Sequence, residues 1–394
     1  MVLGITLTIR IVVIVFCAPW AGWVADRIGV RTALIASDLS RALIVVGFFF
    51  VEEVWQIYAL AVLLNLGAAI FTPVYKAVIP GITTTAQYPR ALALGSVAYD
   101  TANILGPSLA ALTIAIFGFR GNFVADALTF LVSSALVFGL PRMVAASRTS
   151  PRPVALTHGM TAMLRRWPLR ETLYLALQVS VVGGFVLVAT VDFVKGQLDL
   201  PDTAYAWAMA AYGIGSVVGA VVYGRSSAGV RQAFFHAAAP SMLAALAGAG
   251  YFERFEPLLI AWALAGAGQC VLGIRGNELL AANSTPDERP HIYAAHFSLS
   301  HAGWGLTYPL AGFAVTALGF ATSAYLFAGL LTAISLPLWL KRLRLAAVHV
   351  RLPDRVHDHS HSAFDPPGDY HTHEHRHGDL VHSHPHQHGV PHEH

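Results

Sequence analysis

The chain has few charged residues and almost no cysteine. Asp, Glu, Lys and Arg make up 12% of its 394 residues, whereas a soluble globular chain has roughly 25%. A net charge of +3 is too small to indicate nucleic-acid binding. Cys17 and Cys270 lie in apolar stretches, so we predict buried thiols rather than a disulfide framework. No nucleophile and base pattern, phosphate loop or nucleotide motif is present, and we predict that the protein is not an enzyme.

Long apolar runs take the place of the missing charge. Hydrophobic residues make up 55% of the chain, and a bilayer core about 30 Å thick requires about 20 apolar residues per helical span. We therefore predict an all-α membrane protein within the lipid bilayer. Its eleven predicted spans are Val2–Ala25, Ala33–Val51, Val54–Pro80, Leu92–Phe117, Gly121–Leu140, Glu171–Phe193, Thr203–Tyr223, Ala233–Phe252, Pro257–Ala281, Ile292–Leu318 and Phe320–Leu340.

Basic residues gather in the loops of one predicted side, which the positive-inside rule makes cytoplasmic. The opposite loops hold only Arg120, Lys195 and Arg254. Residues 141–170 are rich in Arg, Pro, Ser and Thr, and we predict a cytoplasmic linker there. It separates an N-terminal bundle of five spans, 1–140, from a C-terminal bundle of six, 171–341. Residues 342–394 are predicted to be a disordered, histidine-rich cytoplasmic tail.

The two predicted bundles share a weak internal repeat. Pro89 recurs as Pro290 and Gly118-Phe119 as Gly319-Phe320, each at a displacement of 319 − 118 = 201. Single identities between apolar helices arise by chance, but a constant displacement across a helix and its loop is better evidence. Two halves in the same orientation predict parallel repeats about an axis along the membrane normal.

The first span leads into Gly22-Trp-Val-Ala-Asp26-Arg27-Ile-Gly29-Val-Arg31. This sequence resembles the G-x-x-x-D-R-x-G-x-R loop of the major facilitator superfamily, and the resemblance implies that superfamily's fold and a secondary transporter. It also assigns a gating motif to Gly22, Asp26, Arg27, Gly29 and Arg31. In the family this loop follows the second helix, so we expect the family's first helix to be missing. An ordinary basic turn that sets topology is the alternative interpretation.

The fourth span contains Gly106-Pro107, which is similar to the Gly-Pro element of exporters in the superfamily. Proline removes a backbone donor and bends a helix, and small residues allow close helix contact. We predict an exporter-like kink at these two residues. Gly-Pro kinks also occur in membrane helices of other functions.

Ionisable residues inside spans are candidate sites because they are costly to insert. Asp100 and His301 are separated by 301 − 100 = 201 residues, which is the repeat displacement. We predict that they face each other, with Asn103 nearby, and bind a divalent cation or exchange protons. Structural hydrogen bonds are the alternative. Asp38 and Arg41 are predicted to form a local ion pair at i and i+3.

Histidine fills the end of the chain, with 14 of the 19 histidines in residues 349–394. Histidines at alternate positions of an extended strand lie on one side, and imidazole binds borderline transition metals. We predict that the tail binds Ni²⁺, Co²⁺ or Zn²⁺. The eight proposed ligands are His371, His373, His375, His377, His382, His384, His386 and His388.

An apolar body ending in such a tail resembles the nickel-resistance exporters of bacteria. The resemblance implies a proton-coupled exporter of nickel or cobalt in the bacterial inner membrane, without a tightly bound cofactor. Two alternatives stay open. The body could export a small organic compound, such as a drug or siderophore, with the tail regulatory or incidental. Or the protein could be a membrane anchor without transport activity that displays a metal-binding tail.

Overall fold

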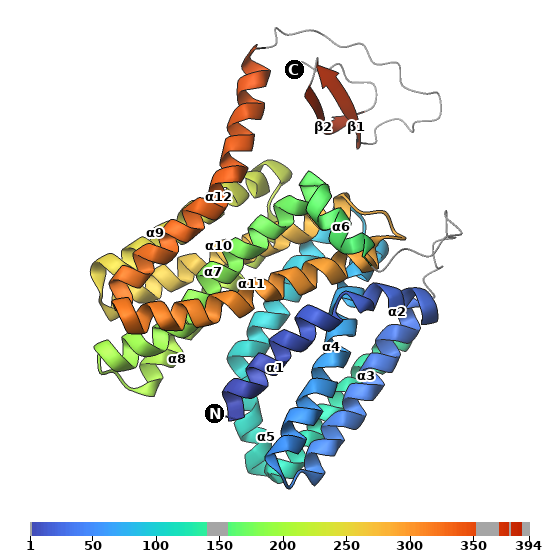
Figure 1. Ribbon diagram of the computed structural model, residues 1–394, viewed down its shortest axis with the longest axis vertical. Coiled ribbons are helices and arrows are strands. Elements are labelled where there is room, and N and C mark those ends of the chain that lie inside the picture. The colour runs from blue at the N-terminus through green and yellow to red at the C-terminus, as the bar shows by residue number, and fades with distance from the viewer. Residues whose placement is uncertain (1, 140–156, 352–369, 378–379, 388–394) are drawn as a thin grey trace. The chain divides into compact units, whose positions relative to one another are not determined.

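A computed structural model of the chain describes residues 2–139, 157–351, 370–377 and 380–387 (Figure 1). The chain divides into two compact units, Met1–Ser335 and Leu336–His394. The helices are α1 (Val2–Cys17), α2 (Trp20–Ile28), α3 (Val30–Gly47), η1 (Phe48–Phe50), α4 (Val54–Ile82), α5 (Tyr88–Gly139), α6 (His158–Arg165), α7 (Trp167–Val191), η2 (Asp192–Gln197), α8 (Asp202–Arg225), α9 (Ala228–Phe252), α10 (Phe255–Ala282), α11 (Arg289–Leu318) and α12 (Phe320–Arg351).

The prediction of an all-α multi-pass membrane protein is confirmed. Among the described residues, eight helices are long and apolar enough to cross a membrane, and up to nine if the bent pair α1 and α2 forms one span. The predicted count of eleven exceeds this number because two predicted spans, the first part of α5 and α11, are not among them. For α11 the reason is its polarity, since His291, His296 and His301 lower its hydropathy.

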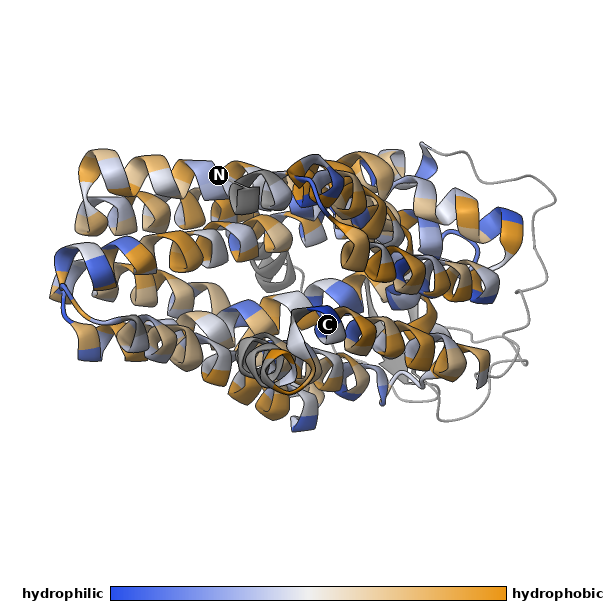
Figure 2. Ribbon diagram, turned by 90° about the horizontal axis from the view of Figure 1, so that it is seen from below, coloured by the Kyte–Doolittle hydropathy of each residue, from blue (hydrophilic) through white to orange (hydrophobic). Residues whose placement is uncertain are grey.

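The outward side chains fit a lipid environment. Leu43, Leu94, Leu306 and Phe313 expose between 71% and 75% of their surface, and Figure 2 shows apolar residues running along the length of the helices. An exposed apolar surface of this extent is unusual in a soluble monomer but is the expected surface of a bilayer-embedded protein.

The helices of the first unit pack in two groups. In the first group α3 packs against α4 and α5, with α1 and α2 against α4; in the second, α10 packs against α7, α8 and α9. The second group also includes α11, which packs on α7. The two groups meet where α5 packs on α8 and where α1, α2 and α4 pack on α11. Aromatic side chains fill the second group, where Phe185 lies 4.9 Å from the ring of Phe327 and is surrounded by Trp262 and Phe320.

The internal repeat is visible in the backbone. Gly118 has φ 72° and ψ 172°, and Gly319 has φ 77° and ψ 170°. A side chain would strain this backbone, which only glycine adopts readily. Gly118 therefore breaks α5 at the boundary predicted between the fourth and fifth spans, and Gly319 separates α11 from α12 in the same way.

The second unit contains the end of α12 and two strands, β1 (Tyr370–His377) and β2 (Leu380–Gln387), which pair antiparallel. The register sets His371 opposite His386, His373 opposite His384 and His375 opposite His382. Within 342–394 the structure describes the end of α12, to Arg351, and these two strands, and the disorder of the tail stays a prediction. The predicted ligand His388 lies outside the described residues.

Candidate functional site

The loop that resembles the family motif forms a tight turn between α2 and α3. Gly29 ends α2 and begins α3 with φ 85°. One helical turn earlier, the Nε2–H of His291 on α11 donates to the Asp26 carboxylate, at 3.0 Å. A Cβ on Gly22 would come within 2.7 Å of the His291 ring. The motif residues Gly22 and Asp26 therefore hold an imidazole from the other half of the chain, 265 residues away from Asp26.

The motif arginines lie differently. Arg27 stacks over the ring of Trp23 at 5.1 Å, and Arg31 over the ring of Phe138 at 4.7 Å. Arginine stacked on an aromatic ring is partly shielded from water and retains its positive charge. Both arginines thus contact aromatic rings of the first half.

Glu288 joins α11 to the linker helix α6. Its Oε1 accepts from the guanidinium of Arg166 at 2.8 Å and from the backbone N–H of Thr285 at 3.0 Å. Its Oε2 contacts Nε2 of His158 at 3.0 Å. Glu288 is 7% exposed, so these partners are needed to compensate for the lost hydration of the carboxylate.

The electrostatics of Glu288 follow from these contacts. Burial alone would raise the pKa of its carboxyl group. Hydrogen bonds from Arg166, His158 and the Thr285 backbone outweigh burial and lower the pKa from 4.5 to about 2. The contact with α6 is therefore made by an ionised carboxylate at neutral pH.

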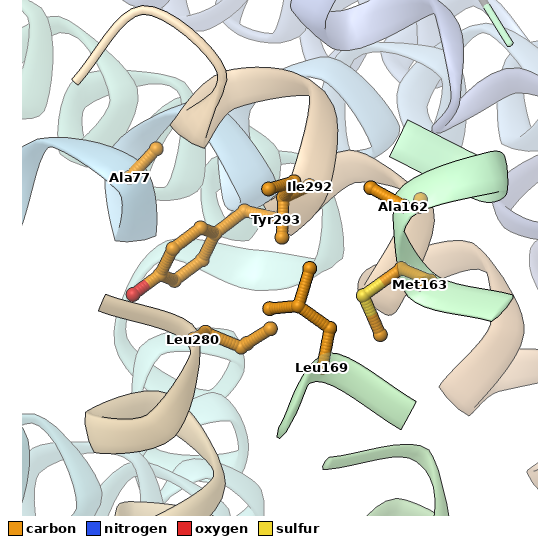
Figure 3. Packing of buried hydrophobic residues seen from close by; sticks show 8 residues of the cluster. Ala77, Ala162, Met163, Leu169, Leu280, Ile292 and Tyr293 are labelled. Carbon is orange, nitrogen blue, oxygen red and sulfur yellow. The ribbon is translucent and has the colours of Figure 1, made fainter. Parts of the chain in front are cut away.

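A third contact joins α5, α10 and α11. The hydroxyls of Tyr88 and Tyr293 lie 3.0 Å apart, and both lie within hydrogen-bond distance of the backbone carbonyl of Asn277, at 3.2 and 3.3 Å. Tyr293 also belongs to an apolar cluster, which brings together Ala77 of α4, Met163 of α6 and further residues of α7, α10 and α11 (Figure 3).

These contacts all lie at one end of the helices, where the loops predicted to be cytoplasmic meet. We call the set Asp26–His291, Glu288 with His158 and Arg166, and Tyr88–Tyr293 the basic-end lock. In Figure 1, α2 and α6 both lie beside the start of α11, with which each makes direct contact. The basic-end lock thus joins the first half to the second through Asp26–His291 and Tyr88–Tyr293, and joins the linker helix α6 to the second half through Glu288.

The predicted site residues inside the spans are only partly brought together. The Nδ1 atom of His301 lies 2.9 Å from the backbone carbonyl oxygen of Phe297, within hydrogen-bond distance, and the imidazole packs against the Phe297 ring. Asp100 and Asn103 lie on α5, which packs mainly on α3, α8 and α10, whereas α11 packs mainly on α1, α2, α4, α6 and α7. The side chains of Asp100 and Asn103 lie outside the described residues, so the pairing of Asp100 with His301 stays a prediction.

Three further predictions concern α5, α3 and metal binding. Gly106 and Pro107 lie inside α5, whose non-helical backbone is at Gly118, and the exporter-like kink stays a prediction. The predicted ion pair between Asp38 and Arg41 is confirmed. Among residues with described side chains, no group of three or more His, Cys, Asp or Glu could hold a metal ion.

Comparison with known proteins settles the family. The sequence profile described as Major Facilitator Superfamily matches residues 1–194 and, in a second match, 173–366. The chain belongs to the Major Facilitator Superfamily. The predicted superfamily membership and fold are thus confirmed. This family consists of membrane transporters rather than enzymes.

Sequence relatives match part of the chain. An uncharacterised transporter of this superfamily, YfiS of Bacillus subtilis, is 27% identical over 221 residues, which cover 54% of this chain and 52% of YfiS. The multidrug resistance protein MdtG of Enterobacter lignolyticus is 28% identical over 117 residues, 30% of this chain and 28% of MdtG. The chain thus spans about half the length of the first of these relatives and less of the second.

Solved structures share the fold of this superfamily member. The human organic anion transporter MFSD10 (TETRAN) superposes with a TM-score of 0.72 at 15% identity, over 84% of this chain and 82% of that one. The transporter FucP in its outward conformation gives a TM-score of 0.65 at 12% identity, over 84% and 87%. At such identities the likeness is one of fold.

Proposed function

We propose that this protein exports small organic compounds from the cytoplasm by alternating access, with the basic end on the cytoplasmic side of a bacterial inner membrane. The observation that carries the proposal is the contact between Asp26 of the family motif and His291 of the opposite half. A contact between halves at one end is what a rocking transporter must break to open that end. The partial similarity to MdtG, a multidrug resistance protein, favours efflux over uptake.

Proton flow down its gradient would drive this export. Histidine side chains can carry protons in transport, and two of them, His291 and His158, belong to the basic-end lock. Each contacts a carboxylate, with Nε2–oxygen distances of 3.0 Å. Proton exchange at these pairs would strengthen or release the lock, which would link proton movement to opening.

Transport in proteoliposomes tests the proposal. The purified full-length protein would be reconstituted, and the flux of ethidium and of carboxyfluorescein would be measured with and without a pH gradient. We expect gradient-dependent flux of at least one compound, and a loss of flux in Asp26→Asn. Glu52→Gln, a change of an exposed carboxylate away from the lock, serves as the control. Flux no greater than in protein-free liposomes for every compound would reject the proposal and favour the membrane-anchor alternative.

A second candidate function concerns the tail. The pairing of β1 with β2 sets three histidines of one alternation opposite three of the other, and directly opposed strand positions are neighbours on one face of a sheet. We propose that this arrangement binds Ni²⁺, Co²⁺ or Zn²⁺. Metal export by the body would additionally require a ligand within the spans, for which Asp100 stays the candidate.

Calorimetric titration of the full-length protein with each metal tests the tail proposal. We expect binding that a deletion of 349–394 abolishes and that His373→Gln with His384→Gln weakens more than His392→Gln with His394→Gln. No heat of binding for any of the three metals would reject it. Metal flux that Asp100→Asn abolishes would restore metal as the exported substrate.

A further inference from the structure

A lone lysine lies within the fourth helix. Lys76 is the only charged residue of α4, and a charged residue within a span is costly to insert. In the described part of the chain, no hydrogen bond or ion pair is formed by its ammonium group. Its electrostatic neighbours are instead His296 and His301 of α11. Among the described side chains, no carboxylate accompanies this cation and the two imidazoles.

His296 is also incompletely bonded. The ring lies near the backbone of Thr172 on α7. Its Nε2 atom is buried and has no hydrogen-bond partner among the described residues. Buried polar atoms in native proteins normally have a partner, so an orphan nitrogen beside an orphan lysine indicates a missing group.

A second cation extends the cluster on the side of α1. Arg10 interacts electrostatically with His301 and with Tyr308 of α11. The helices are held together here by close contacts, since the hydroxyl of Ser298 donates to the carbonyl of Val15 at 2.6 Å. A Cβ on Gly305 would lie 2.9 Å from Ile11, the neighbour of Arg10. The cluster is thus built by α1 and α4 of one half and α11 of the other.

We infer that Lys76, His296, His301 and Arg10 bind an organic anion, a compound that carries a carboxylate, sulfonate or phosphate group. Such a group supplies negative charge that the described side chains around Lys76 do not provide, and it bonds the ammonium of Lys76. Because residues of both halves take part, anion binding acts across the interface that must move in transport. The inference rests on the proposed export of organic compounds and names their charge. The positive charges of Lys76 and Arg10 also disfavour the binding of a divalent metal ion at this site.

Binding measurements on the intact protein test the site. Full-length protein would be placed in nanodiscs of phosphatidylcholine, so that no anionic lipid competes, and titrated with carboxyfluorescein and with ethidium by fluorescence anisotropy. We expect carboxyfluorescein to bind and Lys76→Gln to weaken its binding about tenfold, the loss expected for one charge-assisted hydrogen bond. Lys76→Arg keeps the charge and should retain binding within about threefold. Lys195→Gln, which removes a lysine outside the cluster, should leave binding unchanged.

The outcomes separate this inference from the proposed function. Equal carboxyfluorescein affinity in wild type and Lys76→Gln, or binding of ethidium in preference to carboxyfluorescein, would overturn the anion site. Flux of ethidium but not of carboxyfluorescein would support export and reject the anion site. Anion binding that depends on Lys76 without any flux would retain the site and reject export. If Lys76→Gln does not fold, His296→Gln provides the same comparison through the orphan nitrogen.

Discussion

Two loops at equivalent places in the two halves have the same local structure and different contacts. In the first loop Thr84 N–H donates to Gln87 Oε1 at 3.2 Å, and in the second Thr285 N–H donates to Glu288 Oε1 at 3.0 Å. A proline follows two residues later in both, and the next helix begins. Gln87 is exposed, however, while Glu288 is buried and bonded to α6. One change of side chain thus converts a helix-capping loop into a joint between elements.

A second change in the same loop has a similar effect. At the displacement of 201, Arg90 of the first half corresponds to His291 of the second. Arg90 is exposed, whereas His291 is buried and donates to Asp26. The comparison indicates that the duplicated fold supplied the loop, and that two side chains of the second copy formed most of the basic-end lock.

Of the contacts that only the second loop makes, the close approach of α6 to His291 should be the most sensitive to substitution. A Cβ on Gly159 would lie 2.2 Å from the carbonyl oxygen of His291, and backbone cannot move aside as a flexible side chain does. Gly159→Ala should therefore lower stability by about 3 kcal/mol, an overpacking cost. Thermal melting in detergent measures this. Gly229→Ala, which has open space around it, is the control, and equal melting temperatures for both variants would contradict the prediction.

The positive-φ backbone shared by Gly118 and Gly319 should be equally sensitive to an added side chain in both halves. Gly118→Ala and Gly319→Ala each place a side chain at φ above 70°, with an expected cost of about 2 kcal/mol. The two melting temperatures should fall by similar amounts, and Gly329→Ala should leave the melting temperature near that of wild type. A loss at only one of the two positions would show that the repeat is not energetically equivalent there.

Exchanging the differing side chains sharpens the comparison further. Glu288→Gln keeps the cap that Gln87 makes in the first loop but removes the charge that binds α6. Because Arg166 is 45% exposed, water screens the ion pair, and we expect a loss of about 1 kcal/mol, seen as about fivefold faster amide exchange in α6. The reciprocal Gln87→Glu should not change exchange in α6. Slower exchange in that variant would argue against the assignment.

The smallest expected effect is a dependence on pH. Since the pKa of Glu288 is lowered in the folded protein, its ionisation stabilises the fold above pH 4.5, and that stabilisation is lost as the pH falls toward 2. The difference in melting temperature between wild type and Glu288→Gln should therefore shrink between pH 5 and about pH 3. A difference that stays constant over this range would show that the carboxylate is not the group involved.

The sequence predicted the parts of the fold that depend on local pattern. Apolar runs marked the helices, Gly118 and Gly319 marked equivalent breaks, and the spacing of Asp38 and Arg41 predicted their ion pair. Each of these signals lies within one helix or turn. The motif loop was recognised too, because its ten residues are contiguous.

The contacts between halves could not be predicted in this way. Nothing near Asp26 in the sequence indicates a contact with His291. From the sequence, Glu288 is an ordinary acidic loop residue, because its contacts with α6 depend on tertiary packing. The pairing of Asp100 with His301 was predicted from the repeat displacement, and it stays a prediction because the side chain of Asp100 lies outside the described residues. Lys76 was missed, although a single lysine inside the apolar run 54–80 was a signal that could have found it.

The attachment of α6 to α11 has a consequence for competition by free peptides. Only Arg166 separates α6 from α7, so α6 behaves as a ligand tethered next to its binding surface, at high effective concentration. A free peptide copy of α6 would therefore need roughly millimolar concentration to displace the attached helix.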